Sequence, residues 1–267
     1  MPRANRHHIP GQIWHITHRC HQREFLFRFA KDRKRWLQWL FEAKKRYGLS
    51  ILNYMVTSNH IHLLAVDDES DAISKSLQLI AGRTAQEFNQ RKGRRGAFWE
   101  DRYHATAIES GEHLLRCLVY IDMNMMRAGV VSHPSEWPHC GYHEIHSPLQ
   151  RYTLIDRSRL IELSGTVDDE QLRKRHREWV EQSILVDKNK RRPAWTEAIA
   201  IGSEDFVEQI KREMGIKALG RNIELTDGAH MLREPASAYG AHSKHEKVGL
   251  SHENTVYFDI KAGELIC

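Results

Sequence analysis

The sequence predicts an α+β fold in which an antiparallel sheet carrying helices is followed by a mostly helical C-terminal region. Two observations predict it. Over roughly the first 145 residues, two kinds of segment take turns. Short segments have apolar side chains at every second position, and longer segments carry an apolar stripe at helical spacing. Beyond about residue 150 the pattern is mostly helical. No stretch approaches the ~20 consecutive apolar residues that a membrane span needs, so we expect no membrane partner.

The first elements alternate between strand and helix. Residues 12–20 alternate and are rich in β-forming side chains, which predicts a strand. A helix follows and ends at Gly48, because glycine is the usual residue after a last helical turn. Residues 49–57 and 60–66 are predicted to form two further strands. The apolar stripe of the helix consists of Trp36, Leu37, Leu40 and Phe41.

The remaining elements complete a known supersecondary order. An acidic turn at residues 67–71 starts a second helix, which ends at the basic loop 91–96. A fourth strand is predicted near residues 102–108, and an extra helix from Glu112 to about Ala128. The order β-α-β-β-α-β is ferredoxin-like, as in RRM-like modules, with helices on one sheet face and the other face open. The stripe of the second helix consists of Ile73, Leu77, Ile80, Thr84 and Phe88.

Three prolines mark the end of this first domain: Pro134, Pro138 and Pro148. We therefore predict a first domain over residues 1–147 and a helical accessory region over residues 148–245. Segments 168–184 and 203–214 of the accessory region look amphipathic. Residues 246–267 lack clear periodicity and are predicted to be a poorly ordered tail.

The net charge of +5 is unevenly spread along the chain. Residues 1–50 carry 12 Lys and Arg against 3 Asp and Glu, whereas residues 148–267 carry 19 against 20. Positive charge concentrated near one end is the usual mark of a polyanion partner, most often nucleic acid. The alternative is a solvated helix face.

The cysteines and the N-terminus bear on the compartment. The four cysteines are scattered without a CxxC pair, which fits a reducing cytosol better than a disulfide scaffold. The first residues lead into no long apolar segment of the kind found in signal peptides. We therefore expect a cytoplasmic, nucleoid-associated protein.

The tripeptide His60-Ile61-His62 lies within a predicted strand. Side chains of a strand alternate between its faces, so the two histidines point the same way and Ile61 points the other way. Two imidazoles side by side can hold one metal ion. Chance is the alternative, because the chain has 18 histidines and a half-buried strand accommodates the partly apolar ring.

Tyr120 and Asn124 are four residues apart on a predicted helix and so share one of its faces. An Asn oxygen suits Mg²⁺ or Mn²⁺, and imidazole tolerates Mn²⁺. If this helix packs beside the strand, Asn124 joins His60 and His62 around one ion, with Tyr120 a helical turn away. A tyrosine hydroxyl beside a cation can attack phosphorus to give a covalent phosphotyrosine. The alternatives are a core role for Tyr120, a local hydrogen bond for Asn124, or one of the rival tyrosines Tyr54, Tyr103 and Tyr142.

Over roughly residues 8–145 the chain resembles the HUH single-tyrosine transposases, and most of all the REP-associated tyrosine transposases. The resemblance implies that the two histidines and the Asn bind Mg²⁺ or Mn²⁺ and that the Tyr is the nucleophile. Those roles fall on His60, His62, Asn124 and Tyr120. The segments that carry the resemblance are Trp14-His15-Ile16-Thr17-His18-Arg19, Asn59-His60-Ile61-His62-Leu63-Leu64, residues 94–103 and residues 120–129.

The sequence departs from the family pattern in three places. Thr57-Ser58 replaces the usual Met-Pro, Asn124-Met125 replaces Asn-Pro, and residues 137–142 replace an aromatic-Ser-Ser segment. None of these changes removes a chemical group that the mechanism needs.

The resemblance also implies a partner, which is single-stranded, hairpin-forming DNA such as REP-like palindromes. The protein would cleave and rejoin it as a monomer or homodimer. The alternatives are a non-catalytic hairpin-binding regulator of DNA or RNA and a phosphodiesterase that uses water instead of Tyr120. The side chains expected to contact phosphates are Arg19, Arg23, Arg91, Lys92, Arg94 and Arg95. The rings that could stack on bases are Trp14, Trp99 and Tyr103, with core packing the favoured role for at least one of the two tryptophans.

A further cluster comprises His139, Cys140, His143 and His146. It resembles part of a zinc site, but it holds one cysteine and its spacing fits no standard finger. Surface histidines near an inter-domain segment are the favoured interpretation.

Overall fold

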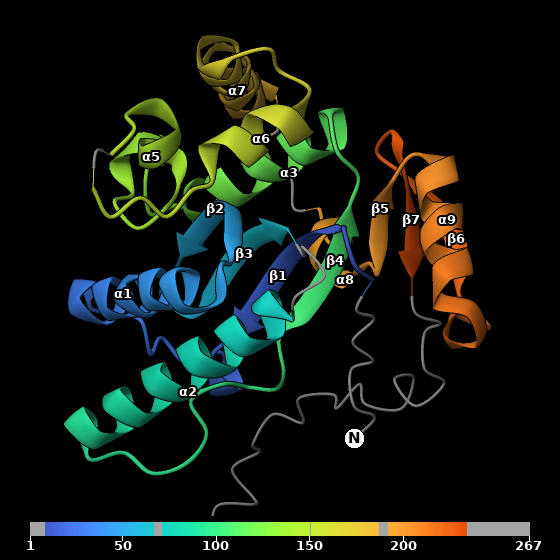
Figure 1. Ribbon diagram of the computed structural model, residues 1–267. Coiled ribbons are helices and arrows are strands. Elements are labelled where there is room, and N and C mark those ends of the chain that lie inside the picture. Colours follow the sequence, from blue (N-terminus) through green and yellow to red (C-terminus); the bar gives the residue numbers. More distant parts are fainter. Residues whose placement is uncertain (1–8, 67–70, 150, 187–191, 234–267) are drawn as a thin grey trace, which may run out of the picture. The chain divides into compact units, whose positions relative to one another are not determined.

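The computed structural model describes residues 9–66, 71–149, 151–186 and 192–233, all of which belong to one compact unit. Its centre is a seven-stranded sheet with the strand order β2-β3-β1-β4-β5-β7-β6 (Figure 1). All neighbouring strands run antiparallel except β4 and β5. Most of the expected acidic turn (67–70) and the expected tail (246–267) lie outside the described residues.

The first part of the chain confirms the ferredoxin-like order. Its elements are β1 (Ile13–Arg19), α1 (Ala30–Tyr47), β2 (Ser50–Val56), β3 (His60–Val66), α2 (Ala72–Lys92) and β4 (His104–Ile108), with a short 3₁₀ turn at His21–Arg23. Helix α1 ends as predicted, because Gly48 adopts φ +68° and returns its N–H to the carbonyl of Lys44. The central strand β1 pairs with β3 on one side and β4 on the other.

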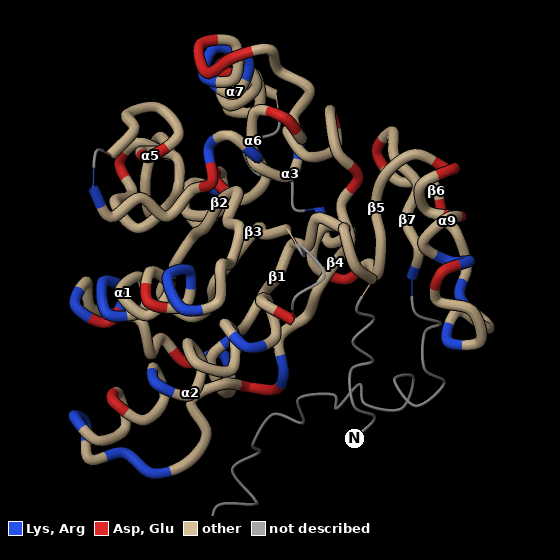
Figure 2. Tube along the Cα trace, viewed as in Figure 1, with Lys and Arg blue, Asp and Glu red and all other residues tan. Residues whose placement is uncertain are grey.

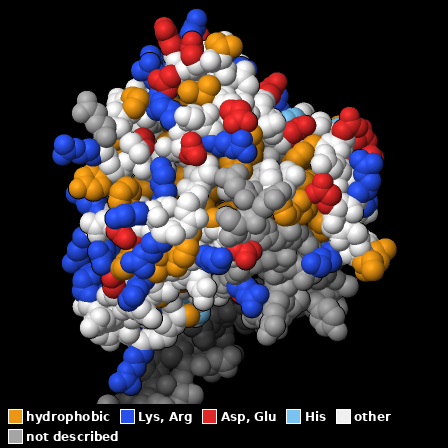
Figure 3. Space-filling view, in the orientation of Figure 1, with side chains coloured by type: hydrophobic (Ala, Val, Ile, Leu, Met, Phe, Trp, Pro, Cys, Tyr) orange, Lys and Arg blue, Asp and Glu red, His pale blue; other side chains and the backbone are white. Residues whose placement is uncertain are grey.

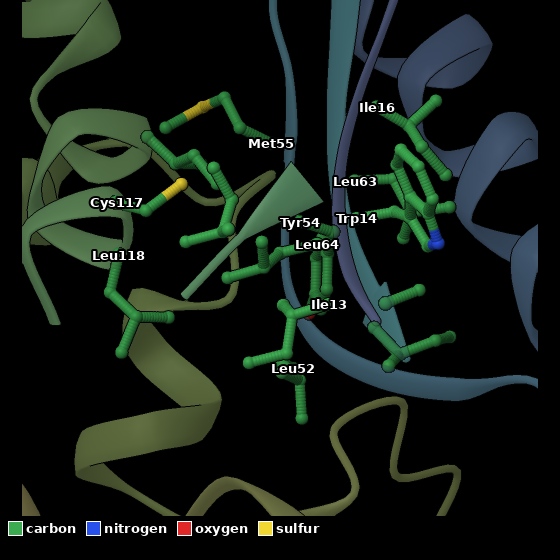
Figure 4. Packing of buried hydrophobic residues seen from close by; sticks show 14 of the residues in the cluster. Ile13, Trp14, Ile16, Leu52, Tyr54, Met55, Leu63, Leu64, Cys117 and Leu118 are labelled. Atoms are coloured by element: carbon green, nitrogen blue, oxygen red, sulfur yellow. The ribbon is translucent and has the colours of Figure 1, made fainter. Parts of the chain in front are cut away.

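Both faces of this sheet are covered, which corrects the expectation of an open face. Helices α1 and α2 lie together on one face, and α3 (Glu112–Asp122) packs on the other (Figure 1). Figure 4 shows Trp14 and Leu63 on one side of the strands and Met55, Leu64 and Leu118 on the other. Every residue of β2 is buried, because apolar side chains from two helical layers meet it.

The helix predicted to run unbroken to residue 128 is divided. α3 ends at Asp122, and the short α4 (Asn124–Arg127) begins two residues later. Met123 joins them with φ −71° and ψ −3°, so the chain keeps its direction, and the Met123 N–H still bonds to Val119. Tyr120 and Asn124 therefore stay on the same side, although they belong to two helices.

Residues beyond 148 are rich in helices, as expected, but they also contribute three strands that were not predicted. β5 is only three residues long, which is too short to recognise by alternation. β6 and β7 form a hairpin around Asp227-Gly228, both with positive φ, and this Asp-Gly pair was the available signal. The remaining elements are 3₁₀ turns at Pro134–Glu136 and Gly215–Ala218, α5 (Tyr142–His146), α6 (Arg157–Ser164), α7 (Asp169–Val186), α8 (Ala194–Glu197), β5 (Ala200–Gly202), α9 (Glu204–Met214), β6 (Asn222–Thr226) and β7 (Ala229–Arg233).

The three strands extend the sheet of the first part of the chain, because β5 pairs in parallel with β4. None of the helices in the described ranges is long and apolar enough to cross a membrane.

Candidate active site

His60 and His62 lie at the start of β3, on the sheet face that α3 covers. Their ring centroids are 4.9 Å apart and their planes are nearly perpendicular. His62 is buried and His60 is half-buried, while Ile61 is buried in the opposite layer. The period-two argument therefore placed both imidazoles correctly on one face.

Asn124 and Tyr120 approach His62 from the helical side. The Asn124 Nδ2 atom lies 2.8 Å from His62 Nε2 and donates to it. The Tyr120 ring centroid is 6.2 Å from that of His62, with the rings perpendicular. One strand and two consecutive helices thus bring together the four residues that the sequence singled out.

His15 is a member of this cluster that the sequence analysis did not select. Its Nδ1 lies 2.7 Å from the main-chain carbonyl oxygen of Trp195, and its Nε2 lies 2.9 Å from His62 Nδ1. A carbonyl only accepts, so His15 Nδ1 carries the proton and its Nε2 accepts from His62 Nδ1. His62 then presents the lone pair of Nε2 toward Asn124. Alternation along β1 was the available signal, because His15 shares a face with Thr17, the β3 partner of His62.

The ring of His60 is oriented by the turn that precedes it. Its Nδ1 lies 2.7 Å from Asn59 Oδ1 and 3.0 Å from Thr57 Oγ1. The Thr57 hydroxyl donates to the His60 carbonyl at 2.8 Å, so toward Nδ1 it acts as an acceptor. Both contacts place the proton on Nδ1 and make Nε2 the nitrogen that would bind a metal. Thr57 stands where the resembled family usually has Met.

The residues present fit a divalent ion held by two imidazole nitrogens and one amide oxygen. Asn124 would present Oδ1 after its amide turns over, since oxygen and nitrogen exchange places in that rotation. Within the described ranges, no three His, Cys, Asp or Glu side chains gather into a possible metal cluster. The amide of Asn124 is in contact with His62.

Burial keeps the two inner histidines neutral, which is the form that metal ligation requires. Desolvation, aided by the nearby positive charge of other groups, lowers the pKa of His62 well below its usual value. For His15, desolvation lowers the pKa to about 4, against the raising effect of its bond to Trp195.

Arg127 is a second residue that the sequence analysis missed. Its guanidinium carbon lies 4.4 Å from the centre of the Tyr120 ring, and its Nη2 donates to the Tyr120 carbonyl at 2.6 Å. Arg127 follows Tyr120 by two helical turns, so the spacing alone could have identified it. The Arg127 guanidinium is therefore in a position to bind a phosphate group that approaches the Tyr120 ring.

The basic residues predicted to contact DNA lie near the His60 end of the sheet. Arg19 pairs across the strands with His60, and the N–H of the next residue, Cys20, bonds to Asn59. The loop after α2 joins this edge, because Arg94 forms an ion pair with Glu24 at 3.2 Å. Figure 2 shows Lys and Arg along α1 and in the loop after α2. Figure 3 shows Lys and Arg side chains gathered at the surface on the side where α1 lies.

The individual basic side chains differ in their partners. Arg91 forms an ion pair with Asp32, and Arg19 lies 3.8 Å from Glu100. The ammonium of Lys92 lies 5.0 Å from the centre of the Phe29 ring. Arg23 and Arg95 are exposed.

The aromatic residues proposed to stack on bases pack inside the protein instead. Tyr103 and Trp14 are buried. Trp99 is half-buried, stacks on His18 at 4.0 Å and contacts the rings of Phe27 and Phe98. Of these three rings, Trp99 is the one that keeps part of its surface exposed.

The histidine-cysteine segment at 139–146 forms no zinc cluster among the described residues. His139 and Cys140 are buried rather than at the surface, and burial lowers the pKa of His139 to about 4. His146 instead lies 3.0 Å from His176 in α7, whose other ring nitrogen lies 3.0 Å from Asp122 in α3. This contact ties α7 to the helix that carries Tyr120.

Comparison with known proteins agrees with the arrangement. Residues 9–124 match the family described as "Transposase IS200 like". The matched segment includes all four residues predicted for the active site. No curated protein matches the chain.

Among solved structures, one that resembles the chain is described as the REP-associated tyrosine transposase bound to a REP hairpin. It is 20% identical, covers 58% of this chain and 94% of its own, and has a TM-score of 0.47.

Proposed function

We propose that the protein cleaves and rejoins single-stranded, hairpin-forming DNA through a covalent intermediate on Tyr120, with a Mg²⁺ or Mn²⁺ ion at His60, His62 and Asn124. One observation carries the proposal: Asn124 and Tyr120 reach the same histidine from the helical layer. Such a convergence of nucleophile and metal ligands is needed for this chemistry and is not needed for DNA binding alone.

In the proposed step, the Tyr120 hydroxyl oxygen attacks the scissile phosphorus. The Tyr120–phosphorus bond forms and the bond to the 3′ oxygen breaks. The tyrosine loses its proton and the 3′ oxygen gains one, which leaves a 5′-phosphotyrosyl end and a 3′-hydroxyl. A bound divalent ion supplies polarisation of the phosphodiester. The guanidinium of Arg127, beside the Tyr120 ring, would neutralise charge that develops on the phosphate.

The same step can run backward, because the phosphotyrosine keeps the energy of the broken bond. A 3′-hydroxyl from another strand can then displace Tyr120 and complete strand transfer. The basic residues near His60 would contact the phosphates of the arriving DNA, and this attraction should weaken as salt rises.

The experiment is a denaturing gel of the full chain incubated with end-labelled hairpin DNA carrying single-stranded flanks, with Mn²⁺ or Mg²⁺. We expect a covalent protein–DNA band that disappears in Tyr120→Phe and in His62→Ala. Tyr54→Phe is the matched control, since Tyr54 is buried on β2 and bonds to Glu144.

Two outcomes would contradict the proposal. DNA binding without any cleavage would favour the non-catalytic regulator. Cleavage that persists in Tyr120→Phe would favour a water-based phosphodiesterase.

A further inference from the structure

A cavity of about 360 Å³ opens beside Tyr120. Its walls come from α3, α7, α8 and the turn between β6 and β7, so it exists only because the C-terminal region packs against the catalytic helix. Its volume lies at the lower end of the range for small-ligand sites, which is about 300–1,000 Å³.

The lining of this cavity combines aromatic rings with guanidinium groups. Trp179 and Trp195 join Tyr120, and the Trp195 ring centroid is 6.1 Å from that of Tyr120 with the planes 31° apart. Arg116 and Arg127 belong to the Tyr120-bearing side. Trp179 is half-buried, so its ring is held in place while part of it faces the cavity.

The charges of the cavity are partly balanced. Arg116 forms an ion pair with Glu112, one turn earlier on α3, and Arg192 lies 3.6 Å from Asp227. Among the described residues of the lining, three arginines thus stand beside two carboxylates. Such a lining favours a small anion carrying a flat ring over a wholly apolar ligand.

We infer that this cavity holds one unpaired nucleotide of the DNA strand attached to the scissile phosphate, with its base against Trp179 and its phosphate near Arg116. Every base has a π-face and stacks on an aromatic side chain, and guanidinium is the preferred partner of phosphate. The inference rests on the proposed function, because it takes Tyr120 as the point where the strand is cut. The site would select strands with an unpaired flank over a blunt hairpin.

The test compares affinities in a Tyr120→Phe background, which removes cleavage from the measurement. The probes are a blunt hairpin and the same hairpin with randomised single-stranded flanks. Fluorescence anisotropy measures the affinity of the protein for each probe. We expect the flanked hairpin to bind more tightly, and Trp179→Ala with Arg116→Ala to reduce that advantage about 10-fold. The control pair is Trp39→Ala with Arg83→Ala, an Arg–Trp contact between α1 and α2 at 5.5 Å.

A second readout locates the contact directly. Flanks that carry 5-iodouracil should photo-crosslink to α7 or α8 peptides, and mass spectrometry identifies the residue. An unchanged flank advantage in the Trp179/Arg116 variant, or crosslinks confined to other elements, would overturn the inference while leaving the covalent band of the proposed function intact. Loss of all hairpin binding by the parent protein would overturn both.

Discussion

His15 Nε2 lies 2.9 Å from His62 Nδ1, and His15 Nδ1 lies 2.7 Å from the carbonyl of Trp195. This chain of contacts joins the C-terminal region to a proposed metal ligand through one buried ring. It specifies which nitrogen of His62 carries the proton, and so which nitrogen is available to an ion. The relationship gives His15 a positioning role that can be tested without DNA.

Replacement of His15 by Phe should weaken Mn²⁺ binding about 10-fold, because His62 loses the partner that sets its tautomer. Titration followed by the electron paramagnetic resonance signal of unbound Mn²⁺ measures this affinity directly. His15→Gln should restore part of it, since an amide can accept from His62 and donate to Trp195. His133→Gln, at the surface loop before Pro134, is the control. Equal Mn²⁺ affinity in His15→Phe and the parent would exclude the role.

Replacement of Thr57 by Val should lower the free energy of unfolding by about 1–3 kcal/mol. The Thr57 hydroxyl accepts from the His60 and Asn59 N–H groups at 3.1 and 3.3 Å, and Val leaves these groups without it. Urea denaturation measures the change. Thr84→Val is the matched control, because the buried Thr84 hydroxyl has no hydrogen-bond partner within the described part of the chain. A smaller loss at Thr57 than at Thr84 would refute the argument.

Removal of the residues after 147 should destabilise the protein and abolish cleavage. The truncation takes away the Trp195 carbonyl, the β5 strand beside β4, and His176 opposite buried Asp122. Thermal unfolding should show a lower or absent transition. A truncated protein with the parent's melting temperature and covalent band would show that the first domain is self-sufficient.

Stability should fall as the pH drops from about 7 to 4. Burial lowers the pKa of His139 to about 4 and that of His146 to about 3, so the folded protein keeps both rings neutral. The unfolded chain takes up these protons near pH 6.5, and the folded chain takes them up only at lower pH. The contribution of the two neutral rings to the free energy of unfolding is therefore fully present above pH 6.5 and is lost as the pH falls.

Urea midpoints measured across this pH range test the effect. His139→Gln should flatten the slope, whereas His143→Gln, at an exposed position of α5, should not. A parent protein whose stability is constant between pH 7 and 4 would contradict the assignment.

Local patterns were sufficient to predict much of the site. Alternation placed His60 and His62 on one face, and helical spacing kept Asn124 beside Tyr120. Alternation could not reveal that the second sheet face is covered, because residues far along the chain supply that cover. Local patterns also could not show that Tyr103 is buried or that Trp99 packs against Phe27 and Phe98.

The sequence by itself determined the strands and helices of the first domain and the residue types needed for metal-assisted attack by a tyrosine. Strands and helices depend on interactions within a few residues, and apolar residues that recur every two or about 3.6 positions indicate them. Only the tertiary structure decided that Trp195 holds His15 and that α7 and α8 wall the cavity beside Tyr120. Those contacts join segments more than 50 residues apart in the chain, and no local pattern encodes which distant surfaces will pack together.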